Sequence, residues 1–469
     1  MIGREKERKM LENARDSEYS EFVVVYGRRR IGKTFLVRET FDYTFAFQHA
    51  GLANSDLRHQ LRAFSGSLRD AGLGLKTIPR NWQDAFDLLK DVLRKSNDGK
   101  KVVFIDEMPW MDTPRSGFVA ALENFWNAWA SARKDILLIV CGSATSWIIN
   151  NILRNRGGLH NRVTVEIPLS PFTLRECELY AASRNLGLSR RNIVECYMAL
   201  GGVPYYWKML ERGLSPAQNF DLLFFSSNAR LRMEYSELYA SLFKNPDPYE
   251  KIVSALGRKG CGLVRDEVVA ATGLVDSGAL TRQLEELEEC GFVRRYPVLG
   301  KKKKGSIYQL TDSFTLFHFK VMETVGRVDG HFWTSSVNSP FVSAWEGLAF
   351  ERVCLLHIDE IKKALQIGGV LSGVSPWRSE GNKERVQIDL LIDRSDGVIN
   401  LCEMKFSHEP YVLSAGELDR ILRRRRIFKE QTGTRKAVHL TLVVSPELRH
   451  NANANEIQSV VTLDDLFRE

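Results

Sequence analysis

The chain has 469 residues with a formal net charge of +8, and 44% of its residues are hydrophobic. This length exceeds one ordinary core and predicts about three domains, while the hydrophobic content excludes a disordered chain. No run reaches the roughly 20 apolar residues of a membrane span, and the charged N-terminus lacks the apolar core of a signal peptide, so we expect a cytoplasmic protein without membrane contact. The seven cysteines and nine histidines show neither CxxC nor HxxxH spacing, which predicts reduced thiols and no zinc site. The positive charge favours an anionic partner, above all nucleic acid.

Strand and helix patterns alternate over residues 1–210. The candidate strands are continuous apolar runs at Phe22–Tyr26, Lys101–Glu107 and Ile136–Ser143. The helical patterns between them cover Asp56–Ala71, Trp82–Lys95 and Gly117–Ala132. Because strands without polar alternation are buried on both faces, this order predicts a parallel sheet that helices cover on both sides.

The loop after the first strand reads GRRRIGKT and fits GxxxxGK[ST], with an apolar strand before it and a helix after it. In such a loop the backbone N–H groups wrap phosphates, Lys33 reaches the β- and γ-phosphates, and Thr34 lends its hydroxyl to Mg²⁺. The pattern therefore predicts an ATP site. Its expected nucleotide contacts are Gly27, Arg28, Arg29, Arg30, Ile31, Gly32, Lys33 and Thr34.

Two further strand ends complete the predicted ATP site. VVFIDE ends in Asp106, placed to hold Mg²⁺ through water, and Glu107, placed to activate the attacking water. The alternative is that these two carboxylates cap a helix or lie in solvent at the end of the strand. The strand ILLIVCG is followed by Ser143, a candidate sensor of the γ-phosphate, although a simple strand-to-loop serine would read the same. Arginine-finger candidates follow at Arg154, Arg156 and Arg162.

These motifs, together with GRE near the N-terminus and LGGVPYYW, resemble the AAA+/STAND-type P-loop ATPases, and more narrowly the branch called archaeal ATPases. The resemblance implies ATP and Mg²⁺ as cofactors and allows a homo-oligomer. It also implies that Gly3–Glu5 lies by the nucleotide and that the turn with Pro204 packs near the adenine. A plain turn is the alternative for Pro204.

The pattern of residues 247–315 predicts three helices followed by a two-stranded hairpin. This order is typical of a winged helix-turn-helix. The helices are expected at Tyr249–Leu256, Val264–Ala271 and Ser277–Cys290. The third helix is acidic, with four glutamates against Arg282, and phosphates would repel it. Basic residues lie in the hairpin instead, at Arg294, Arg295 and Lys301–Lys304. We expect either a wing that touches the DNA backbone without reading sequence or a structural module that docks on the ATPase.

The last segment starts with a helix at Phe341–His357 and carries VQIDLLID and LCEMKF. The spacing D-x(13)-E-x-K puts Asp389 on one strand and Glu403 and Lys405 on one face of the next. Two carboxylates suit one or two Mg²⁺ ions, and the lysine can orient or polarise a water for phosphodiester hydrolysis. The alternative is a strand salt bridge in a non-catalytic domain.

This pattern resembles the PD-(D/E)XK nuclease superfamily, although Ile388 stands where a proline usually precedes the Asp. The resemblance implies a metal-ligating Glu on the first helix, where Glu346 and Glu351 are available and the G-x-x-F-E pattern favours Glu351. The predicted metal ligands of this domain are thus Glu351, Asp389 and Glu403, with Glu403 and Lys405 catalytic. The run Arg423–Arg426 is either a DNA-backbone track or a solvated helix face.

The sequence therefore predicts a multidomain α/β protein that binds and hydrolyses ATP and associates with DNA. Its parts are expected as a P-loop ATPase core with a parallel sheet (1–165), a helical lid (166–245), a winged helix-turn-helix (246–315), a linker (316–339) and a restriction-endonuclease-like α/β domain (340–469). The rival is a nucleotide-controlled signalling switch whose C-terminal domain binds a partner without cleavage. A third reading is an ATPase that binds DNA cut by another subunit.

Overall fold

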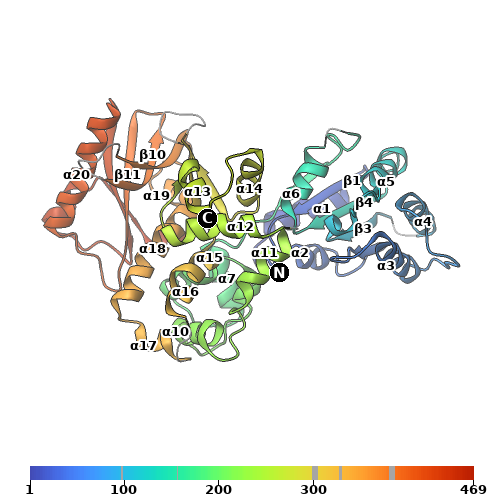
Figure 1. Ribbon diagram of the computed structural model, residues 1–469, viewed down its shortest axis with the longest axis horizontal. Helices are drawn as coiled ribbons and strands as arrows, with labels where there is room; N and C mark the ends of the chain where they lie inside the picture. Colours follow the sequence, from blue (N-terminus) through green and yellow to red (C-terminus); the bar gives the residue numbers. More distant parts are fainter. Residues whose placement is uncertain are drawn as a thin grey trace. The chain divides into compact units, whose positions relative to one another are not determined.

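The computed structural model describes residues 1–96, 99–155, 157–243, 245–297, 305–326, 330–379 and 386–468. They form two compact units, residues 1–171 and residues 172–469, and each is described by itself. Figure 1 follows the chain from blue to red through both units. The finger candidate Arg156 and the basic run Lys301–Lys304 lie outside the described residues. None of the described helices has the length and apolar character that a bilayer crossing needs.

The first unit contains a five-stranded, all-parallel sheet in the order β2-β3-β4-β1-β5. Every residue of β3 and of β4 is buried, which explains why these strands lack polar alternation. The predicted parallel sheet is confirmed. Its strands are β1 (Glu21–Tyr26), β2 (Phe47–Ala50), β3 (Lys101–Asp106), β4 (Ile136–Gly142) and β5 (Val165–Pro168).

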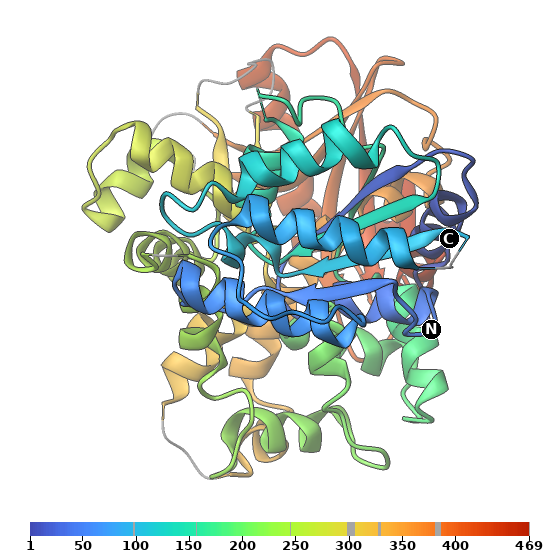
Figure 2. The same cartoon turned by 90° about the vertical axis from the view of Figure 1, so that its right-hand side faces the viewer.

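Helices cover both faces of this sheet. Successive residues of β1 point to opposite sides, so that Phe22 and Val24 join a core with α3, α4 and α5, while Val23 and Val25 join a second core with α1 and α2. Figure 2 shows helices lying across the strands of this sheet. The helices are α1 (Glu5–Asp16), α2 (Lys33–Thr40), α3 (Leu57–Asp70), α4 (Trp82–Lys95), α5 (Phe118–Phe125) and α6 (Thr145–Ile148).

Capping residues define where two of these helices begin. The side chain of Asp56 accepts a hydrogen bond from the backbone N–H of His59, and Asn81 accepts one from Asp84. Helix α4 therefore starts at the predicted Trp82. The helix expected at Gly117–Ala132 is α-helical only to Phe125 and continues as a π-helical turn at Trp126–Ala130.

The second unit begins with a helical region whose starts are fixed by capping boxes at Thr173, Ser189 and Ser215. A three-helix segment with a small antiparallel sheet in the order β6-β8-β7 follows. The elements up to this sheet are α7 (Leu174–Ser183), α8 (Arg190–Leu200), α9 (Pro204–Trp207), α10 (Pro216–Phe220), α11 (Glu234–Leu242), α12 (Asp247–Lys259), β6 (Leu263–Val264), α13 (Arg265–Thr272), α14 (Gly278–Glu289), β7 (Val293–Tyr296) and β8 (Ile307–Leu310).

A mixed sheet ends the chain, in the order β13-β12-β11-β10-β9. The strands β9, β10 and β11 form an antiparallel meander, and β12 and β13 add to β11 in parallel. The remaining elements are α15 (Ser313–Phe317), α16 (Glu323–Val325), α17 (Phe332–Ser336), α18 (Pro340–Leu356), α19 (Ile358–Ala364), β9 (Ser372–Arg378), β10 (Gln387–Arg394), β11 (Val398–Phe406), α20 (Ala415–Thr432), β12 (Ala437–Ser445) and β13 (Ser459–Thr462).

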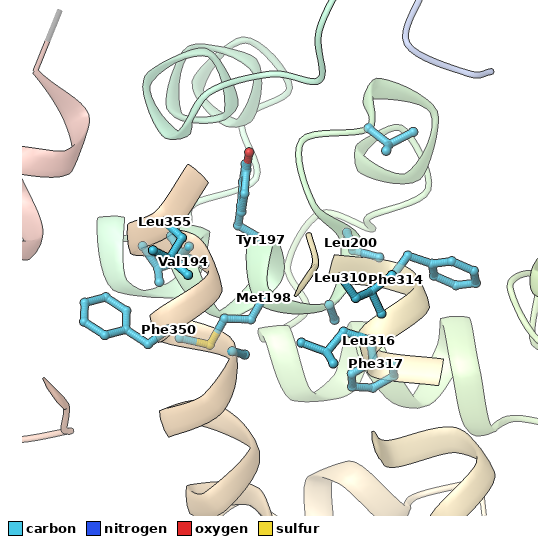
Figure 3. Close-up of a cluster of buried hydrophobic side chains, with 14 of the residues drawn as sticks. Val194, Tyr197, Met198, Leu200, Leu310, Phe314, Leu316, Phe317, Phe350 and Leu355 are labelled. Atoms are coloured by element: carbon cyan, nitrogen blue, oxygen red, sulfur yellow. The ribbon is translucent and has the colours of Figure 1, made fainter. Parts of the chain in front are cut away.

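One hydrophobic core joins distant segments of the second unit (Figure 3). Met198 of α8, Phe314 of α15 and Phe350 of α18 belong to the same buried cluster. The segment 316–339, expected as a linker, takes part in this core, because Phe317 and Trp333 are 0% and 5% exposed. A linker was expected, but these apolar residues lie on the short helices α15 and α17, which pack between the larger elements.

Candidate functional site

The GRRRIGKT loop joins β1 to α2 and turns through backbone conformations that favour glycine. Gly27 has φ 142° and Gly32 has φ 91°, while Arg30 adopts φ 70°. A Cβ on Gly27 would lie 2.2 Å from the carbonyl oxygen of Leu169. Glycine at position 27 is therefore required both by the backbone angle and by the close approach of the chain after β5.

Lys33 and Thr34 are the first residues of helix α2, and the side chains of both make hydrogen bonds. The Lys33 ammonium donates to the carbonyl oxygens of Gly27 at 2.8 Å and Arg28 at 2.9 Å, so it folds back over the loop. The Thr34 hydroxyl donates to Oδ2 of Asp106 at 2.7 Å. A hydroxyl beside a carboxylate is the oxygen donor set that suits Mg²⁺, and the arrangement fits the expected cofactor.

Asp106 is held by neutral donors on its other oxygen. The Cys141 thiol donates to Oδ1 at 2.6 Å and the backbone N–H of Glu107 donates at 2.8 Å. Burial, and then the charge of Asp106, raise the pKa of the Cys141 thiol, so that it remains a donor. No sequence motif predicts this role for Cys141, which lies in the buried strand β4.

Glu107 and Ser143 meet across neighbouring strand ends. Oε2 of Glu107 accepts hydrogen bonds from the backbone N–H of Ser143 at 3.1 Å and from its hydroxyl at 2.9 Å. Glu107 itself has φ 45°, a left-handed conformation that turns its side chain towards β4. The carboxylate expected to activate water is thus oriented by the serine expected to act as a sensor.

Other expected residues of this site have different surroundings. Arg4 donates to the carbonyl of Ser170 and so ties the N-terminal turn to the end of β5. Arg154 and Arg162 are exposed, and their role as fingers stays a prediction. Pro204 begins α9 in the second unit, and its contact with the adenine likewise stays a prediction.

The N-terminal part of the chain is similar to a known family. Residues 1–210 match the family described as an ATPase domain predominantly from Archaea. The match covers less than half of the 469-residue chain. It is also 24% identical over 405 residues to an uncharacterized protein of Methanocaldococcus jannaschii, with 83% of each chain covered.

Solved structures similar to this chain include two archaeal proteins. The Walker-type ATPase of Pyrococcus abyssi has a TM-score of 0.48 at 18% identity and covers 68% of this chain and 96% of its own. The ORC2 protein of Aeropyrum pernix has a TM-score of 0.43 at 15% identity, with coverage of 68% and 93%. Both TM-scores lie below 0.5, so the similarity of residues 1–210 to ATPases rests on the family match.

A second group of charged residues lies on the mixed sheet. Leu390 of β10 pairs with Cys402 of β11, and continuing this antiparallel register by one residue sets Asp389 opposite Glu403. The register of β10 with β9 shifts between Ile388 and Leu391, at the point where Asp389 lies. Such irregularities re-aim side chains on a strand.

Cations and an amide contact the carboxylates of this group. Lys405 Nζ lies 2.9 Å from Oε1 of Glu403, and Arg424 of α20 donates to Oε2 of the same side chain. Gln387 donates to Oδ1 of Asp389 at 2.7 Å. The sequence does not predict Arg424 as a partner, since only the packing of α20 on the sheet shows which arginine of the run contacts Glu403.

Glu351 of α18 belongs to the same electrostatic group. Burial and the nearby charge of Asp389 raise the pKa of Glu351 to about 8, with a smaller contribution from Glu403, while Arg352 and Lys405 oppose the shift. The alternative on the same helix, Glu346, instead accepts from His408 at 3.1 Å. These contacts favour Glu351 over Glu346 as the helix residue of this group.

The C-terminal group does not form a ready metal site. Carboxylates are the ligands that Mg²⁺ prefers. Within the described ranges, however, no three His, Cys, Asp or Glu residues are close enough together to hold one ion. The roles of Glu351, Asp389 and Glu403 as metal ligands, and of Lys405 in catalysis, stay predictions.

The basic residues of the three-helix segment make contacts within the second unit. Arg294 donates to the carbonyl of Leu355 at 2.7 Å, and Arg295 lies 3.6 Å from Glu288. The stripe of Leu280, Leu284 and Leu287 on α14 is buried as core. A contact of these arginines with DNA stays a prediction.

Proposed function

We propose that the ATPase domain binds ATP with Mg²⁺ and hydrolyses it at the loop Gly27–Thr34. The observation that carries this proposal is the hydrogen bond between Thr34 and Asp106, with Lys33 on the adjacent loop carbonyls. Bound Mg²⁺ would neutralise charge on the phosphates. Lys33 would exchange the carbonyl oxygens for phosphate oxygens, Thr34 and Asp106 would hold the ion, and Glu107 would accept a proton from the attacking water.

Calorimetry with ATP and Mg²⁺ tests this proposal together with a phosphate-release assay. We expect saturable binding and hydrolysis in the unchanged protein and their loss in Lys33→Ala. Lys9→Ala removes a lysine from the exposed face of α1 and serves as the charge-matched control. Absence of nucleotide binding by the folded, unchanged protein would refute the proposal.

A second candidate function is phosphodiester hydrolysis by the C-terminal domain. Its support is the single electrostatic group formed by Glu351, Asp389, Glu403 and Lys405, drawn from α18, β10 and β11. The domain runs from a helix through an antiparallel meander to a second helix and a parallel strand, and the group lies on the first helix and the meander. In this proposal Lys405 orients the attacking water. A bound divalent cation would supply charge neutralisation at the phosphate.

Incubation of single- and double-stranded DNA with Mg²⁺ or Mn²⁺, with and without ATP, tests the second function. We expect cleavage that is lost in Asp389→Asn and Lys405→Ala. Lys436→Ala is the control, because Lys436 pairs with Asp393 at 2.6 Å, away from the acidic group. Intact DNA under all these conditions would reject cleavage.

We further propose that residues 246–315 form a winged helix that contributes DNA-backbone contacts. The sequence of α12, β6, α13, α14, β7 and β8 with sheet order β6-β8-β7 supports it. A DNA affinity that falls with salt and is equal for unrelated sequences is expected. A strong sequence preference would contradict this mode of binding.

The rival function is a nucleotide-controlled switch that does not cut. It is favoured by the engagement of Glu403 with two cations and by the lack of a three-ligand group among the described residues. In that case ATP would alter conformation or oligomeric state while DNA stays intact. Limited proteolysis and light scattering with and without ATP, on the same samples as the cleavage assay, separate the two functions.

A further inference from the structure

Glu403 is a carboxylate with a cation on each oxygen. Lys405 approaches Oε1 at 2.9 Å, and the Arg424 guanidinium donates to Oε2. The Glu403 side chain is 11% exposed, whereas those of Lys405 and Arg424 are 29% and 30% exposed. The anion therefore lies beneath two cations that face the solvent.

The position of Arg424 follows from the packing of α20. Ile421 and Phe428 of this helix share a buried cluster with Leu401 of β11, and Glu403 lies two residues further along the same face of that strand. Arg424 falls between the two apolar contacts of the helix and reaches this face. Arg426, two residues later, pairs at 3.2 Å with Glu430 of its own helix instead.

Both oxygens of Glu403 are thus committed to other charges. A divalent cation would have to compete with Arg424 and Lys405 for the same carboxylate, since all three are attracted to one negative charge. Among the described residues, the acidic side chains form no three-ligand group. A lysine beside the acid was part of the predicted pattern, whereas the arginine was not.

A guanidinium has a second natural partner in a nucleic acid. Its planar fork of N–H donors matches two oxygens of a phosphate as well as those of a carboxylate. At 30% exposure, Arg424 is accessible to a phosphodiester arriving from the solvent side. Exchange of the carboxylate for a phosphate would keep the arginine paired and leave Oε2 of Glu403 available.

We propose that Arg424 binds a phosphate of the nucleic-acid substrate and, in the free protein, blocks Glu403 from acting as a metal ligand. The inference rests on the second proposed function, phosphodiester hydrolysis by this domain. It has a thermodynamic consequence: nucleic acid and divalent metal bind cooperatively, because each favours the state in which Arg424 has left Glu403.

The test measures binding and needs no turnover. Mg²⁺ affinity is measured by calorimetry on the full-length protein without nucleotide, for the unchanged chain, Arg424→Ala, Arg424→Lys and the charge-matched Arg426→Ala. Release of one charge-assisted hydrogen bond is expected to tighten Mg²⁺ binding about tenfold in Arg424→Ala. Arg424→Lys is expected in between, and Arg426→Ala within twofold of the unchanged chain.

The affinity for DNA is expected to change in the opposite direction from the affinity for Mg²⁺. Anisotropy of a labelled duplex in the presence of EDTA is expected to weaken in Arg424→Ala, with the slope of log affinity against log salt reduced by about one. In the unchanged chain, duplex DNA is expected to tighten Mg²⁺ binding. Asp389→Asn, in which the C-terminal acidic group is disabled, is the control for this measurement. This linkage measurement needs no arginine variant, so it remains informative if an arginine variant fails to fold.

The outcomes separate the inference from the function beneath it. Equal or weaker Mg²⁺ binding in a folded Arg424→Ala, while Asp389→Asn abolishes that binding, overturns the role of Arg424 and leaves the proposed nuclease function standing. Mg²⁺ binding that Asp389→Asn leaves unchanged overturns both, because the acidic group then holds no metal. Tighter Mg²⁺ and weaker DNA binding in Arg424→Ala support the inference.

Discussion

The two units each present carboxylates at the ends of neighbouring strands, but they hold them in different ways. Asp106 accepts from a hydroxyl, a thiol and a backbone N–H, all of them neutral. Glu403 is contacted by an ammonium and a guanidinium. Neutral donors orient a carboxylate and leave its charge available to Mg²⁺, whereas cations cancel it. Under the functions proposed above, Asp106 could bind Mg²⁺ without giving up a cationic partner, whereas Glu403 would first have to exchange one.

The packing of the two units differs as well. The parallel sheet of the first unit separates two cores, one on each face. In the second unit one cluster extends from Phe172 to Phe467 and includes the helical region, the three-helix segment and one face of the mixed sheet, while a smaller cluster covers the other face of that sheet. Segments that the sequence divides into domains thus share one interior, and damage to one of them should destabilise the others.

The largest expected effect concerns the first site. Glu107→Gln should lower the rate of ATP hydrolysis roughly 10²- to 10⁴-fold, because the amide cannot accept the proton of the attacking water. ATP affinity should change little, since Lys33 and Thr34 remain. Steady-state phosphate release and calorimetry measure the two quantities. Glu166→Gln on the exposed edge of β5 is the control, and hydrolysis within twofold of normal in Glu107→Gln would remove Glu107 from the mechanism.

The next prediction tests the shared core of the second unit. Phe317→Ala should lower the free energy of unfolding by about 3–5 kcal/mol, because it empties space around a fully buried ring. Met233→Ala, at a side chain that is 66% exposed, should change it by less than about 0.5 kcal/mol. Urea unfolding of both variants checks this. A small effect of Phe317→Ala would restore the linker interpretation of residues 316–339.

A buried histidine makes the second unit sensitive to acid. His357 Nε2 accepts from the backbone N–H of Leu174 and Nδ1 donates to the carbonyl of Val353, so the ring is neutral. Burial lowers its pKa from 6.5 to about 4. Between these values the unfolded chain binds more protons than the folded one, so the stabilisation is complete above pH 6.5 and is lost as pH falls towards 4.

A shift of about 2.5 pKa units corresponds to about 3 kcal/mol of lost stability. Hydrogen exchange of α18 peptides between pH 7 and 4, corrected for intrinsic exchange, should report this loss. In His357→Gln the second unit should be less stable at pH 7, but its stability should depend less on pH. His49 of the first unit, whose pKa burial also lowers to about 4, is unchanged and serves as the internal comparison. An identical pH profile in the variant would contradict the assignment.

The smallest effect is expected at Ser143. Ser143→Ala removes one of the two hydrogen bonds to Glu107 and keeps the one from the backbone. A single hydrogen bond to a charged group corresponds to about tenfold in rate, with ATP affinity unchanged. Ser131→Ala, whose hydroxyl donates to the Asn127 carbonyl at the surface, is the control. A loss of ATP affinity instead of rate would assign Ser143 to nucleotide binding.

Much of the first unit could be read from its sequence because its signals are local. The loop Gly27–Thr34 needs glycines where the backbone turns through positive φ, and helix α4 begins where Asn81 caps it. Continuous apolar strands imply burial on both faces. Local signals were therefore enough to predict the conformation of the loop Gly27–Thr34, the parallel sheet and the residue types of both acidic groups.

The contacts of those acidic groups depend on long-range packing and could not be predicted from local patterns. Cys141 meets Asp106 across 35 positions and Arg424 meets Glu403 across 21, and both contacts depend on how separate elements pack together. The same holds for residues 316–339, whose apolar side chains belong to a core that also includes residues of α8, α15 and α18. Sequence patterns specify local conformation and residue chemistry, but long-range packing selects the partners of each charge.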